Sequence, residues 1–283
     1  MPPPLSAADL AAFDRDGFVV LREAVPRAVA LACRDALWAK LERDRGIRKD
    51  EPATWAKAEG GRVGLAEAYG GDDLGAPWDA CWSPRLVAAV DQLCGEDRWE
   101  RPGLGWWVVN FPARGGAGAW HVDGSHFKHM LASPEIGLAP MLLFSDVAEG
   151  GDGTMFWPGS HLERTRYDRW HAALGRSASL EDDATAMAEM EAPGCPAGGA
   201  IVFDFRLLHR GMPNTGGRER AMAHAVLSTG LAADQLSFPE ASLRAAVDAL
   251  PRDPESAEHR AQREAVAQQQ REAWAAVRSS SAR

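Results

Sequence analysis

The run Trp106-Trp107-Val108-Val109-Asn110-Phe111 has the composition of a β-strand, because aromatic and β-branched residues dominate it. Further short runs of the same kind follow, each bounded by Gly, Pro, Asp or Ser, at residues 141–147, 154–157, 199–205 and 221–228. Short strands separated by turn residues are typical of an antiparallel sandwich or barrel. We therefore expect a mainly β protein whose β core occupies residues 101–230.

The chain before this core is expected to begin with a helix. Ser6 and Asp9 have the spacing of a helix start, since a serine at the cap and an acidic residue in the first turn satisfy free backbone N–H groups. Gly17 is placed to end the helix. Residues 18–21, Phe-Val-Val-Leu, then favour a short strand.

A second helix is expected to start at Pro26, because apolar residues recur after it at helical spacing. These residues are Val29, Cys33, Leu37 and Leu41. Residues 43–82 are rich in glycine and charge and predict loops and short helices, whereas residues 84–93 predict one more helix. Residues 1–100 would thus form a flank of helices and loops.

Two further segments differ from the β core in composition. Residues 162–190 are polar and rich in Ala and Glu, and we interpret them as an insertion that is either a lid over the site or a solvated excursion. Residues 239–283 are rich in Ala, Glu, Gln and Arg and predict one or two surface helices. We expect one domain over residues 1–283.

Charge and cysteine usage limit the possible partners. The net charge of -9 disfavours nucleic acid and anionic membranes, because both attract basic surfaces. The four cysteines form no CxxC pair, and no apolar stretch approaches membrane-spanning length. The first residues do not resemble a charged segment followed by an apolar one, so we expect no signal segment. We expect a cytoplasmic protein with reduced thiols that binds a small molecule. The sequence sets no oligomeric state.

A candidate metal site lies in Trp120-His121-Val122-Asp123-Gly124. In a strand, His121 and Asp123 project to the same face, so both can reach one ion. His209 ends the apolar run 200–209 and can supply a third ligand. Two histidines and one carboxylate on one face of a metal are the ligand set of non-haem Fe(II) oxygenases. A histidine in a strand is nevertheless more often structural than a ligand.

A local zinc cluster is the alternative reading of the same region. His121, Asp123, His126 and His129 are closely spaced, and zinc favours nitrogen ligands. We discount this cluster because Gly124-Ser125 should break the strand and turn His126 and His129 into the following loop.

An ordered series of motifs spans most of the chain. It comprises Phe13-Asp14-Arg15-Asp16-Gly17-Phe18-Val19-Val20-Leu21, His121-Val122-Asp123, the stretch from Gly151-Asp152-Gly153-Thr154 to Pro158-Gly159-Ser160-His161, and His209 with Pro213-Asn214 and Arg220. The series resembles the phytanoyl-CoA dioxygenase family over roughly residues 10–230. The resemblance implies an Fe(II)- and 2-oxoglutarate-dependent oxygenase on a double-stranded β-helix, the jelly-roll or cupin-like core.

The resemblance also implies roles for single residues. His121, Asp123 and His209 match the family's iron ligands. The reaction would use O2 and 2-oxoglutarate and release succinate and CO2. Related halogenases have Gly or Ala in place of the carboxylate ligand, so the presence of Asp123 points to hydroxylation or another oxidation, such as desaturation or ring closure.

The co-substrate contacts follow from the same resemblance. Arg220 stands where the family places the arginine that pairs with the distal carboxylate of 2-oxoglutarate, and Arg218 is the alternative. Asn110 and Thr154 resemble positions that hydrogen-bond the co-substrate in relatives. Gly211 replaces a hydroxyl residue that some members carry just after the distal histidine, which removes one expected contact.

The substrate expected from these observations is a small or medium polar metabolite oxidised at an unactivated C–H bond. No basic patch suits the phosphates of CoA. Two other classes stay open: a cupin-type metal enzyme that does not use 2-oxoglutarate and so does not need Arg220, and a non-catalytic metal-binding module.

Overall fold

The computed structural model describes residues 3–58, 61–65, 79–95, 99, 105–112, 118, 120–122, 135–150, 153–162, 187–225, 227–232 and 244. Most of residues 162–190 and 239–283 lie outside these ranges, so the insertion, the C-terminal helices and the single-domain organisation stay predictions. No helix in the described ranges is long and apolar enough to cross a membrane.

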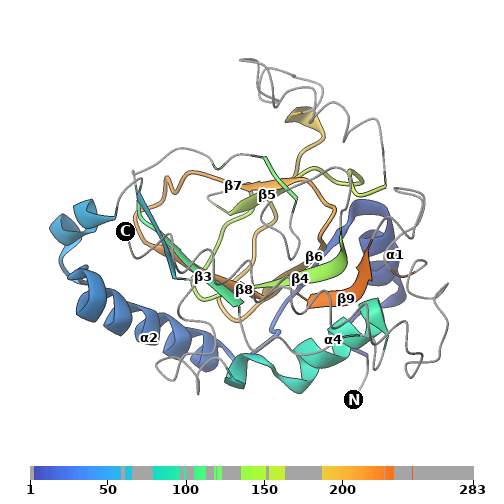
Figure 1. Ribbon diagram of the computed structural model, residues 1–283, viewed down its shortest axis with the longest axis horizontal. Helices are drawn as coiled ribbons and strands as arrows, with labels where there is room; N and C mark the ends of the chain where they lie inside the picture. Colours follow the sequence, from blue (N-terminus) through green and yellow to red (C-terminus); the bar gives the residue numbers. More distant parts are fainter. Residues whose placement is uncertain are drawn as a thin grey trace.

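A large and a small sheet face each other in the described structure. Figure 1 shows the small sheet across the interior from the large one, and helices along the outer side of the large sheet. The helices are α1 (Ala7–Asp16), α2 (Arg27–Arg45), the 3-10 helix η1 (Pro52–Lys57) and α4 (Pro84–Cys94). The expectation of mostly β structure with flanking helices is confirmed.

The large sheet has seven strands in the order β1-β6-β4-β8-β3-β2, and β9 also pairs with β4. Its strands are β1 (Phe18–Leu21), β2 (Arg62–Leu65), β3 (Gly105–Asn110), β4 (Glu135–Leu143), β6 (Ala200–Asp204), β8 (Arg220–Ala225) and β9 (Leu227–Ala232). The small sheet pairs β5 (Thr154–Phe156) with β7 (His209–Gly211). All of these pairs are antiparallel.

The start and end of α1 confirm the prediction made for it. The Ser6 backbone N–H donates to Asp9 Oδ2 at 2.8 Å, and the Asp9 backbone N–H donates to Ser6 Oγ at 3.2 Å. Both backbone N–H groups thereby have a hydrogen-bond acceptor, which is the arrangement called a capping box. Gly17 ends the helix with φ 84°, a left-handed conformation that glycine adopts without a Cβ clash.

Strand β2 differs from the expectation of loops and short helices over residues 43–82. Arg62–Leu65 carries two charged or glycine positions in four, so its composition gives little strand signal. It forms because it pairs with β3, where Val63 lies opposite Val109. This pairing partner is distant in the sequence and leaves no local pattern.

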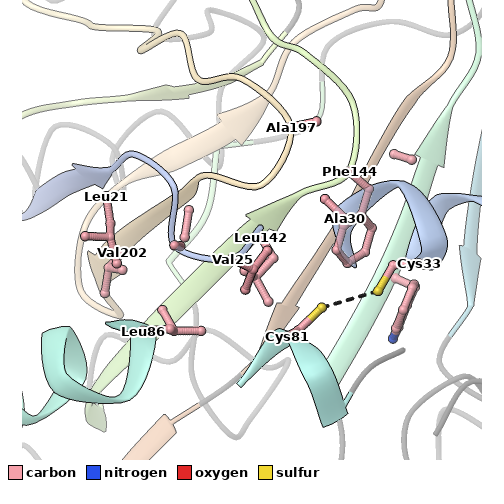
Figure 2. Close-up of a cluster of buried hydrophobic side chains, with 14 of the residues drawn as sticks. Leu21, Val25, Ala30, Cys33, Cys81, Leu86, Leu142, Phe144, Ala197 and Val202 are labelled. Carbon is pink, nitrogen blue, oxygen red and sulfur yellow. Dashed lines mark hydrogen bonds between the residues drawn. The ribbon is translucent and has the colours of Figure 1, made fainter. Parts of the chain in front are cut away.

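The helix-side core lies between the helices and the outer face of the large sheet. Of the stripe predicted on α2, Cys33, Leu37 and Leu41 are fully buried and Val29 packs against the core from a partly buried position. Figure 2 shows Cys33 beside Cys81, with 3.3 Å between their sulfur atoms. All four cysteines are buried, and none of them forms a disulfide.

A second apolar core fills the space between the two sheets. Alternate residues of β4 and β6 divide between the cores: Leu142 and Val202 face the helices, whereas Met141 and Phe203 face the small sheet. Phe156 of β5 meets this inner core from the opposite side. The large sheet is therefore covered on both faces, and its inner face looks toward β5 and β7.

Candidate active site

The small sheet brings together two of the predicted metal ligands. Phe156 of β5 lies opposite His209 of β7, and the segment that contains His121 runs along the other side of β7. The His121 backbone N–H donates to the His209 carbonyl at 3.0 Å, and the His209 N–H donates to the His121 carbonyl at 2.9 Å. Residues opposite each other on antiparallel strands share a face, so both imidazoles point the same way.

The two imidazole rings are close enough to share one ion. Their centroids lie 4.3 Å apart and the planes meet at 50°. His209 is 4% exposed, and its Nδ1 lies 2.9 Å from the Leu207 carbonyl oxygen. A carbonyl can only accept, so Nδ1 carries the proton and Nε2 keeps a lone pair for a metal. These two donors fit a metal ion bound by imidazole nitrogen.

Asp123, the third expected ligand, lies outside the described residues, as do His126 and His129 of the alternative zinc cluster. Within the described ranges no three His, Cys, Asp or Glu side chains form a complete metal site. Only Val122 separates Asp123 from His121 in the sequence. The structure thus places two donors of the expected triad and leaves the third a prediction.

Aromatic side chains surround the His209 ring on the inner side. The ring centroid of Phe203 lies 4.7 Å from it and that of Phe156 lies 5.8 Å away. Phe18 stacks on Phe156 at 4.9 Å. These contacts hold the imidazole between apolar walls, which limits both its rotation and the access of water from that side.

Arg220 approaches the small sheet from the start of β8. It is 5% exposed, and its Nη1 donates to the Gly153 carbonyl at 3.0 Å, directly before Thr154. Thr154 is also 5% exposed and lies opposite Gly211 in the β5–β7 pair. A Cβ at Gly211 would lie 3.8 Å from Arg220 Nη2. Arg220, Thr154 and Gly211 therefore converge on one place inside the protein.

Asn110 and Arg218, the other residues predicted to contact the co-substrate, lie in different environments. Asn110 lies opposite Arg220 in the β3–β8 register, so both side chains belong to the same face of the large sheet. Arg218, the alternative to Arg220, is exposed on the loop before β8. Asn214 ties that loop down, because its Nδ2 donates to the carbonyls of Asn110 at 2.9 Å and Arg218 at 2.7 Å.

Four buried polar residues near His209 received no role from the sequence. They are Ser160, His161, Asp204 and Arg206, none of them more than 3% exposed. Two of them belong to the Pro158-Gly159-Ser160-His161 motif, which was the available signal. The other two lie at and just after the end of a buried strand, where charged residues are unusual.

Known proteins resemble this chain in sequence family and in fold. A family model described as phytanoyl-CoA dioxygenase matches residues 13–222. No curated protein matches the chain. Among solved structures, the non-heme alpha ketoglutarate dependent carbocyclase SnoK from nogalamycin biosynthesis has a TM-score of 0.59 at 19% identity, with 84% of this chain and 93% of that chain covered.

Two further structures share the fold. HygX from Streptomyces hygroscopicus with nickel and 2-oxoglutarate bound has a TM-score of 0.58 at 16% identity, covering 80% of this chain and 88% of that chain. EctD from S. alaskensis with 2-oxoglutarate and 5-hydroxyectoine has a TM-score of 0.54 at 20% identity, covering 80% and 77%. Because the family model spans most of the chain, the protein belongs to the phytanoyl-CoA dioxygenase family, which confirms the expected class of Fe(II)- and 2-oxoglutarate-dependent oxygenases.

Proposed function

We propose that this protein oxidises an unactivated C–H bond of a small or medium polar metabolite, with hydroxylation as the outcome. The observation that carries the proposal is the meeting of His121 and His209, whose rings lie 4.3 Å apart. The facing sheets support a jelly-roll core whose strands come mostly from residues 101–230 and also include β1 and β2 (Figure 1). SnoK is described as a carbocyclase, and the EctD structure contains 5-hydroxyectoine. Both descriptions favour a small-molecule substrate.

In this proposal His121, Asp123 and His209 hold the iron. Nδ1 of His209 is directed to the Leu207 carbonyl, which fixes the tautomer and leaves Nε2 for the metal. When bound, iron supplies the redox chemistry that couples oxidation of 2-oxoglutarate and of the substrate to reduction of O2. The chain's own task is to orient these donors, and the apolar walls of Phe156 and Phe203 exclude water beside them.

Arg220 is proposed to bind the distal carboxylate of 2-oxoglutarate. Its guanidinium is buried, and a buried arginine forms strong paired hydrogen bonds with a carboxylate. The bond from Nη1 to the Gly153 carbonyl orients the group toward the interior. Arg218 is exposed on the surface loop and does not suit this role. A buried arginine in this place favours an enzyme that uses 2-oxoglutarate over the cupin-type alternative, which has no need for it.

Thr154 is proposed to supply the hydroxyl that Gly211 lacks. The two residues lie opposite each other on β5 and β7, so a hydroxyl on either reaches the same region beside Arg220. Thr154 Oγ1 lies 3.4 Å from Met141 Sδ, and a thioether is only a weak acceptor. A carboxylate oxygen of 2-oxoglutarate would be a much better acceptor for the same hydroxyl. Asn110 shares the face of Arg220 and is proposed as a further contact.

An anaerobic titration with Fe(II) and then 2-oxoglutarate tests the proposal. We expect the wild-type protein to bind Fe(II) and to develop the weak visible charge-transfer band of the chelate. His121→Ala should bind no Fe(II). Arg220→Ala should bind Fe(II) normally but 2-oxoglutarate about 10- to 100-fold more weakly, because a hydrogen bond to a charged group contributes about 1.5–3 kcal/mol.

Arg218→Ala is the matched control, since it removes the neighbouring exposed arginine. It should behave as the wild type does. Loss of 2-oxoglutarate binding in Arg218→Ala but not in Arg220→Ala would contradict the arginine assignment. Fe(II) binding without a band in the wild type would instead support the cupin-type enzyme, and full activity of His121→Ala would contradict the metal site.

A further inference from the structure

A cluster of buried polar residues lies beside Leu207 and Leu208, the two residues that lead into His209. We define the polar cluster as Ser160, His161, Asp204 and Arg206, which are 0%, 0%, 0% and 3% exposed. It occupies two turns, one after β5 and one between β6 and β7. Charged and polar groups are rarely buried this fully unless they are paired, so the cluster needs a specific explanation.

Asp204 and Arg206 make the turn between β6 and β7 rigid. Asp204 Oδ1 accepts from the Arg206 backbone N–H at 2.8 Å and from Arg206 Nε at 3.0 Å, and Oδ2 accepts from Nη2 at 2.6 Å. Burial alone would raise the pKa of Asp204, but the Arg206 charge and these hydrogen bonds hold it below its ordinary value. The carboxylate therefore stays ionised and keeps three bonds within the turn.

Hydrogen bonds connect the turn between β6 and β7 directly to His209. The Leu207 N–H donates to the Asp204 carbonyl at 3.0 Å, and the Leu207 carbonyl in turn lies 2.9 Å from His209 Nδ1. The next residue is held from the other side, because the Leu208 N–H donates to Ser160 Oγ at 2.9 Å. Both residues that precede His209 are thus fixed by the polar cluster.

The C-terminal end of α1 anchors the same cluster. The Asp204 N–H donates to the Gly17 carbonyl at 2.9 Å, and the Gly159 N–H donates to the Asp16 carbonyl at 3.0 Å. His161 packs so closely on this helix end that a Cβ at Gly17 would lie 2.6 Å from its Nδ1. The turn before His209 is therefore connected through the polar cluster to a capped helix rather than to a free loop.

From these contacts we infer that the polar cluster positions His209, setting the direction in which Nε2 points at the metal. The inference rests on the proposed function, in which His209 is an iron ligand. Ser160 and Arg206 are positioning residues, since they act through the backbone of residues 207 and 208 and do not touch the metal. Outer partners of metal ligands commonly change metal affinity about 10- to 100-fold when they are lost.

Ser160→Ala tests the inference, with Ser83→Ala as a matched control. Ser83 Oγ accepts from the Leu86 N–H at 3.1 Å at the start of α4, so the control also removes a serine acceptor for a backbone N–H, but far from His209. Affinity for Co(II) is measured by competition with a chelator, together with the visible Co(II) spectrum and the melting temperature.

We expect both variants to melt somewhat below the wild type. Only Ser160→Ala should bind Co(II) about tenfold more weakly and shift the Co(II) absorption, because only there is a ligand's orientation lost. Arg206→Lys, which keeps the buried charge but loses the paired geometry, should shift the spectrum in the same direction.

Two outcomes would overturn the inference in distinguishable ways. If the wild type and Ser160→Ala bind Co(II) equally well with the same spectrum, the polar cluster stabilises the fold without positioning His209, and the proposed function stands. If the wild type does not bind Co(II), the metal-site assignment itself is wrong and the inference falls with it.

Discussion

The large sheet and the small sheet use buried residues in opposite ways. On the helix side of the large sheet, the core consists almost entirely of apolar side chains, such as Leu37 on α2 and Leu86 on α4. On the small sheet, in the turns beside it and reaching toward it, buried polar side chains gather: Thr154, Ser160, His161, Asp204, Arg206, His209, Arg210 and Arg220.

The apolar core on the helix side stabilises the fold, whereas the buried polar residues around the small sheet serve the proposed chemistry. Burying apolar area stabilises the fold without demanding a single geometry, whereas each buried polar group must find a partner in the right place. The small sheet has only three residues in each strand, too few to be stable alone. It is held by the inner core and by the polar cluster. The large sheet thus supplies the free energy that keeps a costly polar site in place.

Leu37→Ala is the change with the largest expected effect on stability. Leu37 is 1% exposed in the helix-side core, and deletion of a buried leucine side chain costs about 2–5 kcal/mol through lost burial and a residual cavity. Urea unfolding should show this loss. Co(II) affinity of the folded variant should remain at the wild-type value, because α2 lies on the outer side of the large sheet (Figure 1).

Glu42→Ala, an exposed change on the same helix, is the control and should alter the unfolding free energy by less than about 0.5 kcal/mol. A large drop in Co(II) affinity in Leu37→Ala would show that the two regions are coupled, and the separation of stability from chemistry would be wrong.

Thr154→Val is expected to weaken 2-oxoglutarate binding while leaving stability nearly unchanged, which is the reverse of Leu37→Ala. The two side chains have nearly the same shape, but valine lacks the hydroxyl that we propose for 2-oxoglutarate. We expect the KM for 2-oxoglutarate to rise about tenfold, because a hydrogen bond to a charged group contributes about 1.5 kcal/mol or more. The melting temperature should change little, since the hydroxyl's partner in the protein is the weakly accepting Met141 sulfur.

Thr54→Val is the matched control, because the Thr54 hydroxyl bonds only to the nearby Arg48 and Glu51 segment around η1. Gly211→Ser sharpens the test further. Position 211 has room for a Cβ beside Arg220 Nη2, so serine there should restore part of the lost affinity in the Thr154→Val background. An unchanged KM in Thr154→Val would remove Thr154 from the co-substrate site.

The same contrast explains what the sequence could predict. The Ser6–Asp9 cap and the α2 stripe were predicted correctly because short-range spacing determines them. The inner and outer faces of β6 were not, since residues 200–204 are all buried and show no alternation. Strand β2 was missed because only its pairing with β3 makes it a strand.

The candidate site was predictable to a similar extent. His121 and His209 could be suggested from strand character, and the structure brings their rings together. For the polar cluster, the sequence offered only the motif that contains Ser160 and His161. Its role could not be suggested, because the contact between Ser160 and Leu208 joins segments that are far apart in the sequence. The choice between Arg218 and Arg220 likewise depends on burial, which two arginines two residues apart do not reveal.

The smallest expected effect is a pH dependence on the helix side. Asp146, just after β4, accepts from Arg27 Nη1 at 2.6 Å and Nη2 at 2.9 Å, and from the Ala197 N–H at 2.9 Å. Arg27 and then the Ala197 N–H lower the pKa of Asp146 from 3.8 to about 2. The Asp146 carboxylate therefore binds a proton more weakly in the folded state than in the unfolded state. The stabilisation that its charge provides is complete above pH 3.8 and is lost as the pH falls toward 2.

Comparison of the wild type with Asp146→Asn by urea unfolding between pH 6 and pH 3 measures this contribution. Because more than half of both side chains is exposed, we expect the difference at pH 6 to be only about 0.5 kcal/mol and to shrink as the pH falls. A difference that stays constant with pH would mean that the carboxylate charge does not stabilise the contact between α2 and the end of β4. That contact would then depend on uncharged interactions, and the contrast with the small sheet would be sharper still.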